Sequence, residues 1–268
     1  MNPIQYVHGY SEKEFERLKD QAQTLTELLH KDTRYPPRSL VLEAGCGIGA
    51  QTISLAKNNP HTQIISLDIS SESIYTAKNR IKKTGYNNIT FCQGNLFSLP
   101  LKDESFDHVF VCFVLEHLSD PKNVLINLKR ALKTGGSITV IEGDHGSAFF
   151  HPDSVSAKKA IQCLINLQAQ RGGNALIGRQ LYPLLYSAGY RDIHVSPRMV
   201  YADASLPEMV EGFTKKTFNA MIEGVKEQAI NSKMIEEKVW SRGIDDLHKT
   251  SEGEGVFCYT FFKAVGIK

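Results

Sequence analysis

Three glycines and two acids carry the clearest chemistry in this sequence. Gly45, Gly47 and Gly49 lie in a short turn between an apolar segment and a predicted helix, Glu43 precedes them, and Asp68 ends the next apolar segment. A turn made of glycines lets the backbone approach a ligand closely and adopt φ angles that other residues resist. The helix behind it presents free N–H groups and a positive dipole end. This pattern predicts a site for a nucleotide-like ligand.

Two kinds of nucleotide fit the turn. Gly45, Gly47 and Ala50 match the fingerprint G-x-G-x-x-G/A of dinucleotide-binding proteins. The charge of Glu43 would repel a pyrophosphate at short range, whereas a cationic ligand would tolerate it. Asp68 can accept hydrogen bonds from both hydroxyls of a ribose, which is common to NAD and other adenosine ligands. The turn and Asp68 alone therefore leave an NAD-dependent oxidoreductase as an alternative.

Four further segments follow the glycine turn in a fixed order. They cover residues 91–100, 106–112, 115–118 and 131–142. Together with the turn, they resemble the small-molecule branch of the class I S-adenosylmethionine (SAM)-dependent methyltransferases. In that family strand three ends in G-D/N-x-x-x-L-P, strand four opens with F-D and closes near E-H-L, and L-K-P-G-G leads into strand five. The resemblance runs from Val41 to Glu142, with Thr134 in place of the usual proline.

The resemblance implies a cofactor and the residues that bind it. The cofactor is expected to be SAM, the product S-adenosylhomocysteine (SAH), and no metal is expected. Asn95 stands where many relatives carry an aspartate that faces the adenine, and its carbonyl oxygen can still accept that hydrogen bond. An amino-terminal helix often crosses the cofactor in such enzymes, so Arg17 is expected to pair with the methionine carboxylate, with a surface arginine as the alternative. The residues expected at the cofactor are Arg17, Gln21, Glu43, Gly45, Cys46, Gly47, Gln51, Asp68, Ile69, Ser73, Asn95, Leu96, Cys112, Phe113 and His117.

Methyl transfer requires mainly that the donor methyl and the acceptor atom are aligned, which can lower the barrier by about 7–11 kcal/mol. A base is needed only where the acceptor is a hydroxyl or a carbon acid. His145 is the candidate catalytic base, because histidine titrates near neutral pH and the flanking glycines allow it to reach into the pocket. A structural histidine in a loop is the alternative. The side chains expected to follow strands four and five are Cys112, Phe113, Glu116, His117, Glu142, Asp144 and His145.

Strands alternate with helices through residue 142, which predicts an α/β fold with helices on both faces of a mostly parallel sheet. The resemblance implies a Rossmann-like sheet of seven strands in the order 3-2-1-4-5-7-6, with strand seven antiparallel. β-branched and aromatic residues place strands six and seven at 193–201 and 256–265. Helices are expected at 11–31, 50–58, 71–84, 121–132, 153–171 and 179–188, with Asp153 capping the fifth.

One methyltransferase domain is expected over residues 1–268. Its parts are an amino-terminal helical cap over the cofactor, a Rossmann-like core, a helical insertion and a final strand, at 1–36, 37–205, 206–250 and 251–268. Ser11 opens a capping box, which predicts the start of the first helix. Apolar residues between positions 209 and 225 recur at helical intervals. They predict either a helical pair packed on the sheet or a cap over the acceptor pocket.

Composition restricts the partners and the compartment. A net charge of +2 gives no general attraction to nucleic acid or to anionic membranes. The five cysteines are odd in number and form no C-x-x-C pair, which is typical of reduced thiols in the cytoplasm. The longest apolar stretch is far too short to span a bilayer, and the first residues show no signal pattern. We therefore expect a cytoplasmic protein without a membrane span.

The acceptor is the least determined part of the function. No N-P-P-Y or D-P-P-Y string follows the fourth strand, and aromatic residues do not alternate with a basic patch, so nucleic acid is not expected as a substrate. The apolar insertion favours a small or medium organic acceptor, such as a quinone-like compound or a secondary metabolite. A SAM-binding protein that has lost catalysis and regulates a partner is the alternative. The oligomeric state is not predicted.

Overall fold

The computed structural model describes residues 12–98 and 101–268. Its centre is a seven-stranded sheet in the order β3-β2-β1-β4-β5-β7-β6. β7 runs antiparallel to both of its neighbours, and the pairs from β3 to β5 are parallel. The predicted Rossmann-like α/β fold, strand order and antiparallel β7 are therefore confirmed. The strands are β1 Leu40–Ala44, β2 Gln63–Asp68, β3 Ile89–Gln93, β4 Phe106–Cys112, β5 Leu132–His151, β6 Arg191–Ala202 and β7 Val256–Ile267.

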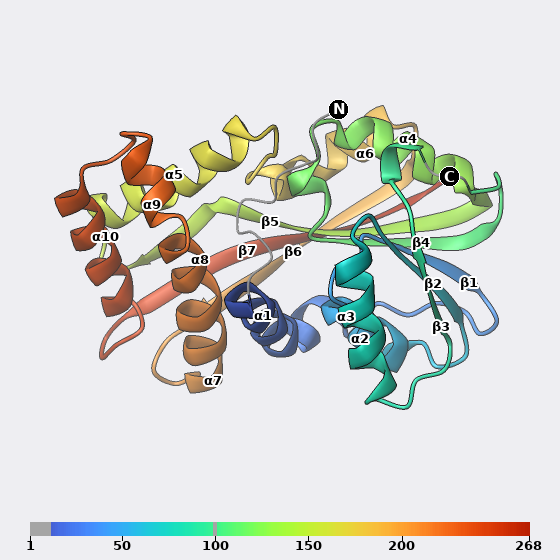
Figure 1. The fold of residues 1–268 in the computed structure, drawn as a ribbon, viewed down its shortest axis with the longest axis horizontal. Coiled ribbons are helices and arrows are strands. Elements are labelled where there is room, and N and C mark those ends of the chain that lie inside the picture. The colour runs from blue at the N-terminus through green and yellow to red at the C-terminus, as the bar shows by residue number, and fades with distance from the viewer. Residues whose placement is uncertain (1–11, 99–100) are drawn as a thin grey trace.

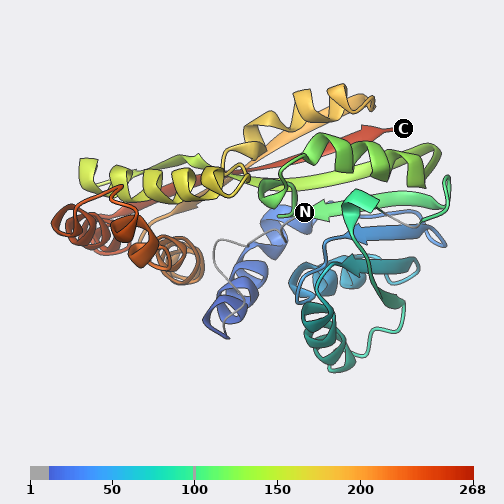
Figure 2. The ribbon, with the colours of Figure 1, turned by 45° about the horizontal axis from the view of Figure 1, so that its top comes forward.

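Helices cover both faces of this sheet (Figures 1 and 2). One face carries α4 (Pro121–Ala131) and α6 (Leu181–Ser187), and the other carries α1 (Glu12–His30), α2 (Ala50–Asn58) and α3 (Ser71–Lys82). Successive strand residues point to opposite faces, so each strand contributes to two separate cores. The core under α4 and α6 contains Leu42, Val109 and Val140, and the core under α1 and α2 contains Val41, Phe110 and Ile141.

β5 continues beyond the residue at which the sequence places its end. It pairs with β7 from Ser137 opposite Ile267 to His151 opposite Val256. The expectation that Glu142, Asp144 and His145 follow strand five is therefore wrong, because β7 provides a partner that extends the strand. The register shifts between Asp144 and Phe149, which is a β-bulge. Bulges re-aim side chains, and this one contains His145.

The segment 206–250 folds into one continuous helix, in which α7, η4 and α8 follow one another without a break, and then into α9 and α10, rather than into the expected pair. These helices pack against α1 and against α5 (Val155–Gln170), at the end of the sheet that the long strands β5 and β7 reach (Figure 1). The middle part of the continuous helix, η4, is π-helical, a rare form that is frequent at functional sites. The helices are α7 Pro207–Met209, η4 Val210–Asn219, α8 Ala220–Glu223, α9 Lys226–Asn231 and α10 Glu237–Lys249.

Two predicted helix starts differ from the structure, and a third lies outside the residues that the structure describes. α5 is capped by Ser154, whose Oγ accepts from the Ala157 N–H at 3.1 Å, and not by Asp153. The predicted helix at 179–188 is a 3-10 turn, Ile177–Gln180, followed by α6. The capping box at Ser11 lies outside the described residues. Over residues 12–98 and 101–268, no helix has both the length and the apolar character that crossing a bilayer requires.

Candidate functional site

The glycine turn between β1 and α2 has the backbone shape that glycine provides. Gly45, Gly47 and Gly49 all have positive φ, at 85°, 50° and 75°. The N–H groups of Gly45 and Cys46 both donate to the Leu67 carbonyl of β2, at 2.8 and 2.9 Å, which fixes the turn over the sheet edge. A Cβ added to Gly47 would meet no atom within 4 Å. The turn therefore presents bare backbone to open space at Gly47, where a ligand can approach it closely.

Asp68, the last residue of β2, faces this turn. Its carboxylate accepts hydrogen bonds from the N–H of Gly47 at 2.7 Å and of Ser70 at 2.9 Å. Two of its oxygen lone pairs are used in this way, and a carboxylate has about four such sites. The remaining sites can accept ribose hydroxyls. Next to it, the Ile69 side chain is 56% exposed, whereas Ser73 in the first turn of α3 is buried.

Glu43 lies beneath the turn and is almost completely buried. Its carboxylate accepts from Thr52 Oγ1 in α2 at 2.8 and 3.0 Å and from Ser66 Oγ in β2 at 2.6 Å. Burial raises the pKa of Glu43 to about 7, although both hydroxyls favour the ionised form. Glu43 thus joins β1, β2 and α2, and a direct contact with the cofactor remains a prediction.

Gln51, in the first turn of α2, contacts a buried histidine. Its Oε1 lies 2.8 Å from Nε2 of His30, the last residue of α1, and the His30 ring lies against Phe110. Burial lowers the pKa of His30 to about 4, with a smaller opposing effect from the Gln51 hydrogen bond. In the described structure Gln51 therefore joins α1 to α2. Its predicted role at the cofactor remains a prediction.

His30 should make the protein sensitive to acid. Its pKa in the folded state lies below the value of about 6.5 in an unfolded chain, so its contribution to stability is fully present above pH 6.5 and is lost as the pH falls toward 4. The loss should be about 3 kcal/mol, from about 1.4 kcal/mol per pKa unit. Urea unfolding of His30→Gln between these pH values should show a flatter pH dependence than the original chain. His61→Gln, at an exposed histidine, is the control and should keep the original slope.

The other residues expected near the adenine and the turn have different surroundings. Asn95 is exposed, and its Oδ1 accepts from the Phe97 N–H at 2.9 Å in the 3-10 turn η1 (Leu96–Ser98). Leu96 is buried beside it. Cys46 and Cys112 are also buried, and burial raises the pKa of both thiols. These cysteines are therefore neutral packing groups at neutral pH.

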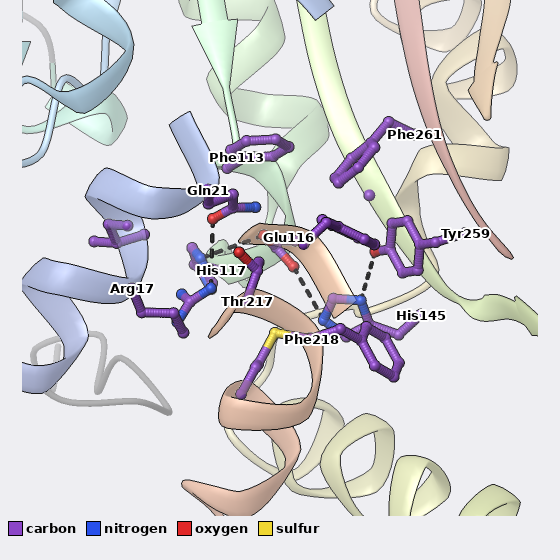
Figure 3. A pocket seen from close by; sticks show the side chains of 14 residues that line it. Arg17, Gln21, Phe113, Glu116, His117, His145, Thr217, Phe218, Tyr259 and Phe261 are labelled. Atoms are coloured by element: carbon purple, nitrogen blue, oxygen red, sulfur yellow. Dashed lines mark hydrogen bonds and ion pairs between the residues drawn. The ribbon is translucent and has the colours of Figure 1, made fainter. Parts of the chain in front are cut away.

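A second part of the site lies between α1, the end of β4, the bulged middle of β5, β7 and η4 (Figure 3). A cavity of about 60 Å³ lies here, and five predicted site residues line it: Arg17, Gln21, Phe113, His117 and His145. Sequence reasoning had placed these residues in three separate segments. The structure thus brings together the candidate base and part of the predicted cofactor set.

Five of the 14 residues that line this cavity are phenylalanines or tyrosines. Phe213 of η4 lies 5.5 Å from Tyr259 and 5.7 Å from Phe261 between ring centroids, and Phe113 lies 5.5 Å from Phe261. The sequence analysis did not assign Tyr259 or Phe261 to the site. Their spacing of two residues in a strand places both on one face, which is the signal that identifies them. The structure therefore adds a face of β7 to the predicted site.

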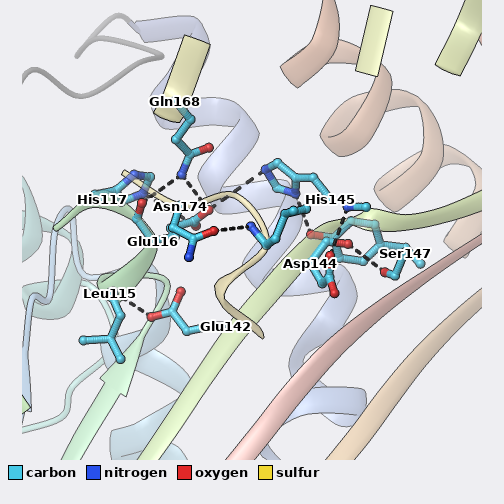
Figure 4. A network of polar contacts seen from close by, with 12 residues as sticks. Leu115, Glu116, His117, Glu142, Asp144, His145, Ser147, Gln168 and Asn174 are labelled. Atoms are coloured by element: carbon cyan, nitrogen blue, oxygen red, sulfur yellow. Dashed lines mark hydrogen bonds and ion pairs between the residues drawn. The ribbon is translucent and has the colours of Figure 1, made fainter. Parts of the chain in front are cut away.

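The polar end of the cavity is a buried network (Figure 4). Glu116 lies in η2 (Leu115–His117), the 3-10 turn after β4. Its Oε1 is 3.6 Å from His117 Nε2, and its Oε2 is 3.2 Å from the Gln168 amide and 4.0 Å from His145 Nε2. Burial opposes ionisation of Glu116, but the two histidines and Gln168 lower its pKa below the usual value.

His145 has contacts on both sides of its ring. Nδ1 lies 2.7 Å from Tyr259 Oη, and Nε2 faces Glu116. Burial lowers the pKa of His145 below its ordinary value, and the charge of Glu116 only partly opposes this. His145 is therefore neutral at neutral pH, the state that a base requires.

Arg17 and Gln21 form the α1 side of the cavity. The Arg17 guanidinium binds Glu14 through Nε at 2.8 Å and Nη2 at 2.6 Å, and Nη1 lies 3.4 Å from Gln21 Oε1. This buried bidentate pair keeps the guanidinium at the edge of the cavity. If Arg17 pairs with the methionine carboxylate as predicted, its guanidinium must bind that carboxylate and Glu14 at the same time.

Two of the acids expected near the reacting atoms have structural roles instead. Glu142 Oε1 accepts from the N–H groups of Val114 and Leu115, and burial together with the charge of Glu116 raises the pKa of Glu142 well above its usual value. Asp144 binds the Arg179 guanidinium through both oxygens. In both cases the carboxyl group holds a segment next to the cavity.

The residues around the turn fit an adenosyl-methionine ligand. Gly47 leaves space for it, Asp68 has free acceptor sites for a ribose, and the turn lies at the same sheet edge as the aromatic cavity, because both follow the carboxyl ends of parallel strands. Within residues 12–98 and 101–268 no group of three or more His, Cys, Asp or Glu side chains is arranged to hold a metal ion.

Comparisons with known proteins identify the family. A family model described as a methyltransferase domain matches residues 38–189. An uncharacterized methyltransferase of Schizosaccharomyces pombe is 32% identical over 164 residues, which cover 58% of this chain and 59% of that protein. A demethylmenaquinone methyltransferase of Lactococcus lactis is 36% identical over 106 residues, which cover 39% of this chain and 42% of that protein. The chain thus spans about half the length of these curated relatives.

Solved structures share the fold. Phosphoethanolamine N-methyltransferase 2 of Haemonchus contortus, in a complex with SAH, aligns with a TM-score of 0.56 at 18% identity, over 93% of this chain and 53% of that one. A putative methyltransferase of Bacillus halodurans aligns with a TM-score of 0.54 at 14% identity, over 93% and 98%. The methyltransferase family model, which covers more than half of the chain, removes the NAD-dependent oxidoreductase as an alternative. The chain belongs to the class I SAM-dependent methyltransferase family.

Proposed function

We propose that this protein transfers the methyl group of SAM to a small or medium organic acceptor that enters at the aromatic cavity, whose volume of about 60 Å³ must widen to hold it. The observation that carries the proposal is the position of that cavity, which lies beside the end of β4 and contains a neutral histidine next to an ionised carboxylate. A methyltransferase that acts on a hydroxyl or a carbon acid needs such a base. The free thiols of the five cysteines support a cytoplasmic location.

Each part of the site has a defined task in this proposal. Asp68 binds the ribose, the backbone at Gly47 approaches the methionine end, and Arg17 with Gln21 binds the carboxylate of that end. When bound, SAM supplies an activated methyl group on a positively charged sulfur. The rings of Phe113, Phe213 and Phe261 exclude water and orient the acceptor. His145 is the base that ends the reaction with the released proton.

The first test separates cofactor binding from turnover. We expect SAH to raise the thermal unfolding temperature of the purified protein and NADH to leave it unchanged. Incubation with methyl-labelled SAM and a panel of phenols, quinols and amines should then yield a labelled product. Binding of SAH with no product from any member of the panel would favour a non-catalytic SAM-binding protein. No retention of SAM or SAH would contradict the proposal as a whole.

His145→Ala should lower kcat for a hydroxyl acceptor by about 100-fold or more, because proton transfer by a positioned side chain contributes about 10²–10⁴-fold. SAH affinity, measured by calorimetry, should change little, since His145 lies in the acceptor cavity. His108→Ala is the matched control, a half-buried histidine of β4 that contacts Ser137. Full turnover by His145→Ala would remove His145 from the reaction.

A further inference from the structure

Three side chains from three separate elements lie in a line at the polar end of the cavity. Tyr259 of β7, His145 of the β5 bulge and Glu116 of η2 are joined by a distance of 2.7 Å from Tyr259 Oη to His145 Nδ1 and of 4.0 Å from His145 Nε2 to Glu116 Oε2 (Figures 3 and 4). We propose that Tyr259 is the residue that touches the acceptor hydroxyl, and that it passes the proton to His145, which Glu116 positions. This inference rests on the proposed function and names its acceptor class.

The contacts of His145 favour an indirect role toward the acceptor. Nδ1 is hydrogen-bonded to Tyr259, and Nε2 faces the Glu116 carboxylate at 4.0 Å. The phenolic oxygen of Tyr259 can donate one hydrogen bond and accept others. Because Tyr259 also lines the cavity, its oxygen is the point at which a proton can enter this chain of groups.

The charge of Glu116 sets the direction of the hydrogen bond. An ionised carboxylate opposite Nε2 favours the tautomer of His145 that carries its proton on Nε2. Nδ1 then has a lone pair and accepts from the Tyr259 hydroxyl. The same carboxylate stabilises the imidazolium that forms when His145 takes up the proton of Tyr259.

The backbone of β5 leaves room for the Tyr259 hydroxyl. A Cβ at Gly143, the residue of β5 opposite Phe261, would overlap the Tyr259 oxygen, so only glycine leaves that space open. The β-bulge that contains His145 is fixed by hydrogen bonds to two other segments. The His145 N–H donates to the Ala175 carbonyl at 2.9 Å, and Ser147 Oγ accepts from the Thr260 N–H at 2.9 Å.

The surroundings favour a neutral phenol or enol over a cationic amine. The oxygens of Glu116 already face His117, His145 and Gln168, so this carboxylate is engaged before an ammonium group arrives. The rings of Phe113, Phe213 and Phe261 in the lining offer flat surfaces that pack well against a flat apolar acceptor. In the step itself the acceptor oxygen bonds to the methyl carbon as the methyl–sulfur bond breaks and its electron pair stays on sulfur. The acceptor proton moves to Tyr259, and the Tyr259 proton moves to His145.

The first experiment uses 4-nitrophenol, whose absorbance reports its ionisation, at a pH below the pKa of the free compound and with saturating SAH. We expect a larger fraction of it to be phenolate when bound to the full chain than when bound to Tyr259→Phe, because Tyr259 connects its proton to His145. Tyr259→Phe should bind it in the neutral form. Tyr190→Phe is the matched control, a buried tyrosine whose hydroxyl donates to the Leu125 carbonyl at 3.1 Å, and it should keep the phenolate signal.

The second experiment needs no substrate. Nitrogen NMR of the histidine side chains should show His145 protonated on Nε2 and hydrogen-bonded at Nδ1, with the Nδ1 signal changed in Tyr259→Phe but not in Tyr190→Phe. A proton on Nδ1 in the original chain would reverse the hydrogen bond and overturn the inference. So would a phenolate signal in Tyr259→Phe, or a failure of the original chain to bind or ionise 4-nitrophenol. Because SAH binding is measured separately, these outcomes leave the proposed cofactor site standing.

Discussion

Replacing Asp68 by alanine is expected to weaken SAH binding by about 100-fold. A hydrogen bond to a charged group contributes about 1.5–3 kcal/mol, and two ribose hydroxyls are expected to donate to this carboxylate. The alanine also removes the acceptor for the Gly47 N–H at 2.7 Å, which orients the turn. Asp68→Asn should bind SAH with intermediate affinity, because its amide keeps one acceptor oxygen. Isothermal calorimetry gives the dissociation constant of SAH for the original chain, for Asp68→Ala and for Asp68→Asn.

The control for Asp68 is another carboxylate that binds the backbone. Asp107 Oδ2 accepts from the Leu40 N–H at 2.8 Å, at the opposite end of β1 and β4 from the glycine turn. Asp107→Ala should lower the free energy of unfolding and leave the SAH dissociation constant unchanged. Binding by Asp68→Ala as tight as in the original chain would show that the ribose is not bound by Asp68 and would undermine the whole cofactor site.

The parallel part of the sheet could be predicted because its signals are local. The strands β1, β2 and β3 are short apolar runs that end at a glycine or a polar residue, and the resemblance to methyltransferases supplies β4 and the strand order. The end of β5 could not be found in this way. Gly143 and Gly146 indicate a loop when only neighbouring residues are considered. In the structure β7 pairs through this region, and Gly143 is needed for the Tyr259 hydroxyl and not for a turn.

In the candidate site too, the residues found from local motifs were predicted, and those brought together by distant packing were not. Gly47 and Asp68 were found from a motif, and the structure brings them into contact. The cavity could be predicted only in part, because it depends on how distant segments pack. Phe213 carried a helical pattern that allowed either a packed helix or a cap, and Tyr259 carried only the alternation of a strand. The direct partners of Glu43, namely Thr52 and Ser66, also depend on packing that no spacing in the sequence specifies. Glu14, by contrast, lies three residues before Arg17 on α1, a spacing that makes two helical side chains neighbours.

Gly45→Ala should cost about 2–5 kcal/mol of stability, the largest loss expected from a single methyl group in the turn. The residue has φ of 85°, which costs an L-residue about 1–2 kcal/mol. Its Cβ would also lie 2.5 Å from Cγ2 and 3.0 Å from Cγ1 of Val114, and overpacking of this kind costs about 1–3 kcal/mol. Urea unfolding measures the change.

Gly47→Ala provides the matched comparison within the same turn. Its φ of 50° is also positive, but its Cβ would meet nothing within 4 Å, so we expect only the backbone cost of about 1–2 kcal/mol. The added methyl would instead occupy the space into which the ligand enters, so SAH affinity should fall by about 10-fold or more, or about 1.4 kcal/mol. The two variants should therefore separate stability from binding.

Val114→Ala tests whether the overlap itself causes the loss at Gly45. In the double variant Gly45→Ala with Val114→Ala, the shortened side chain removes both contacting Cγ atoms, so the double variant should be more stable than the sum of the two single losses predicts. The same pairing with Gly47→Ala should give additive losses, because Gly47 does not contact Val114. If the double variant is no more stable than the sum of its single changes predicts, the cost at Gly45 comes from the backbone alone. The glycine would then be required for its conformation, and the close packing of the β1 turn on the end of β4 would contribute nothing to the choice of residue.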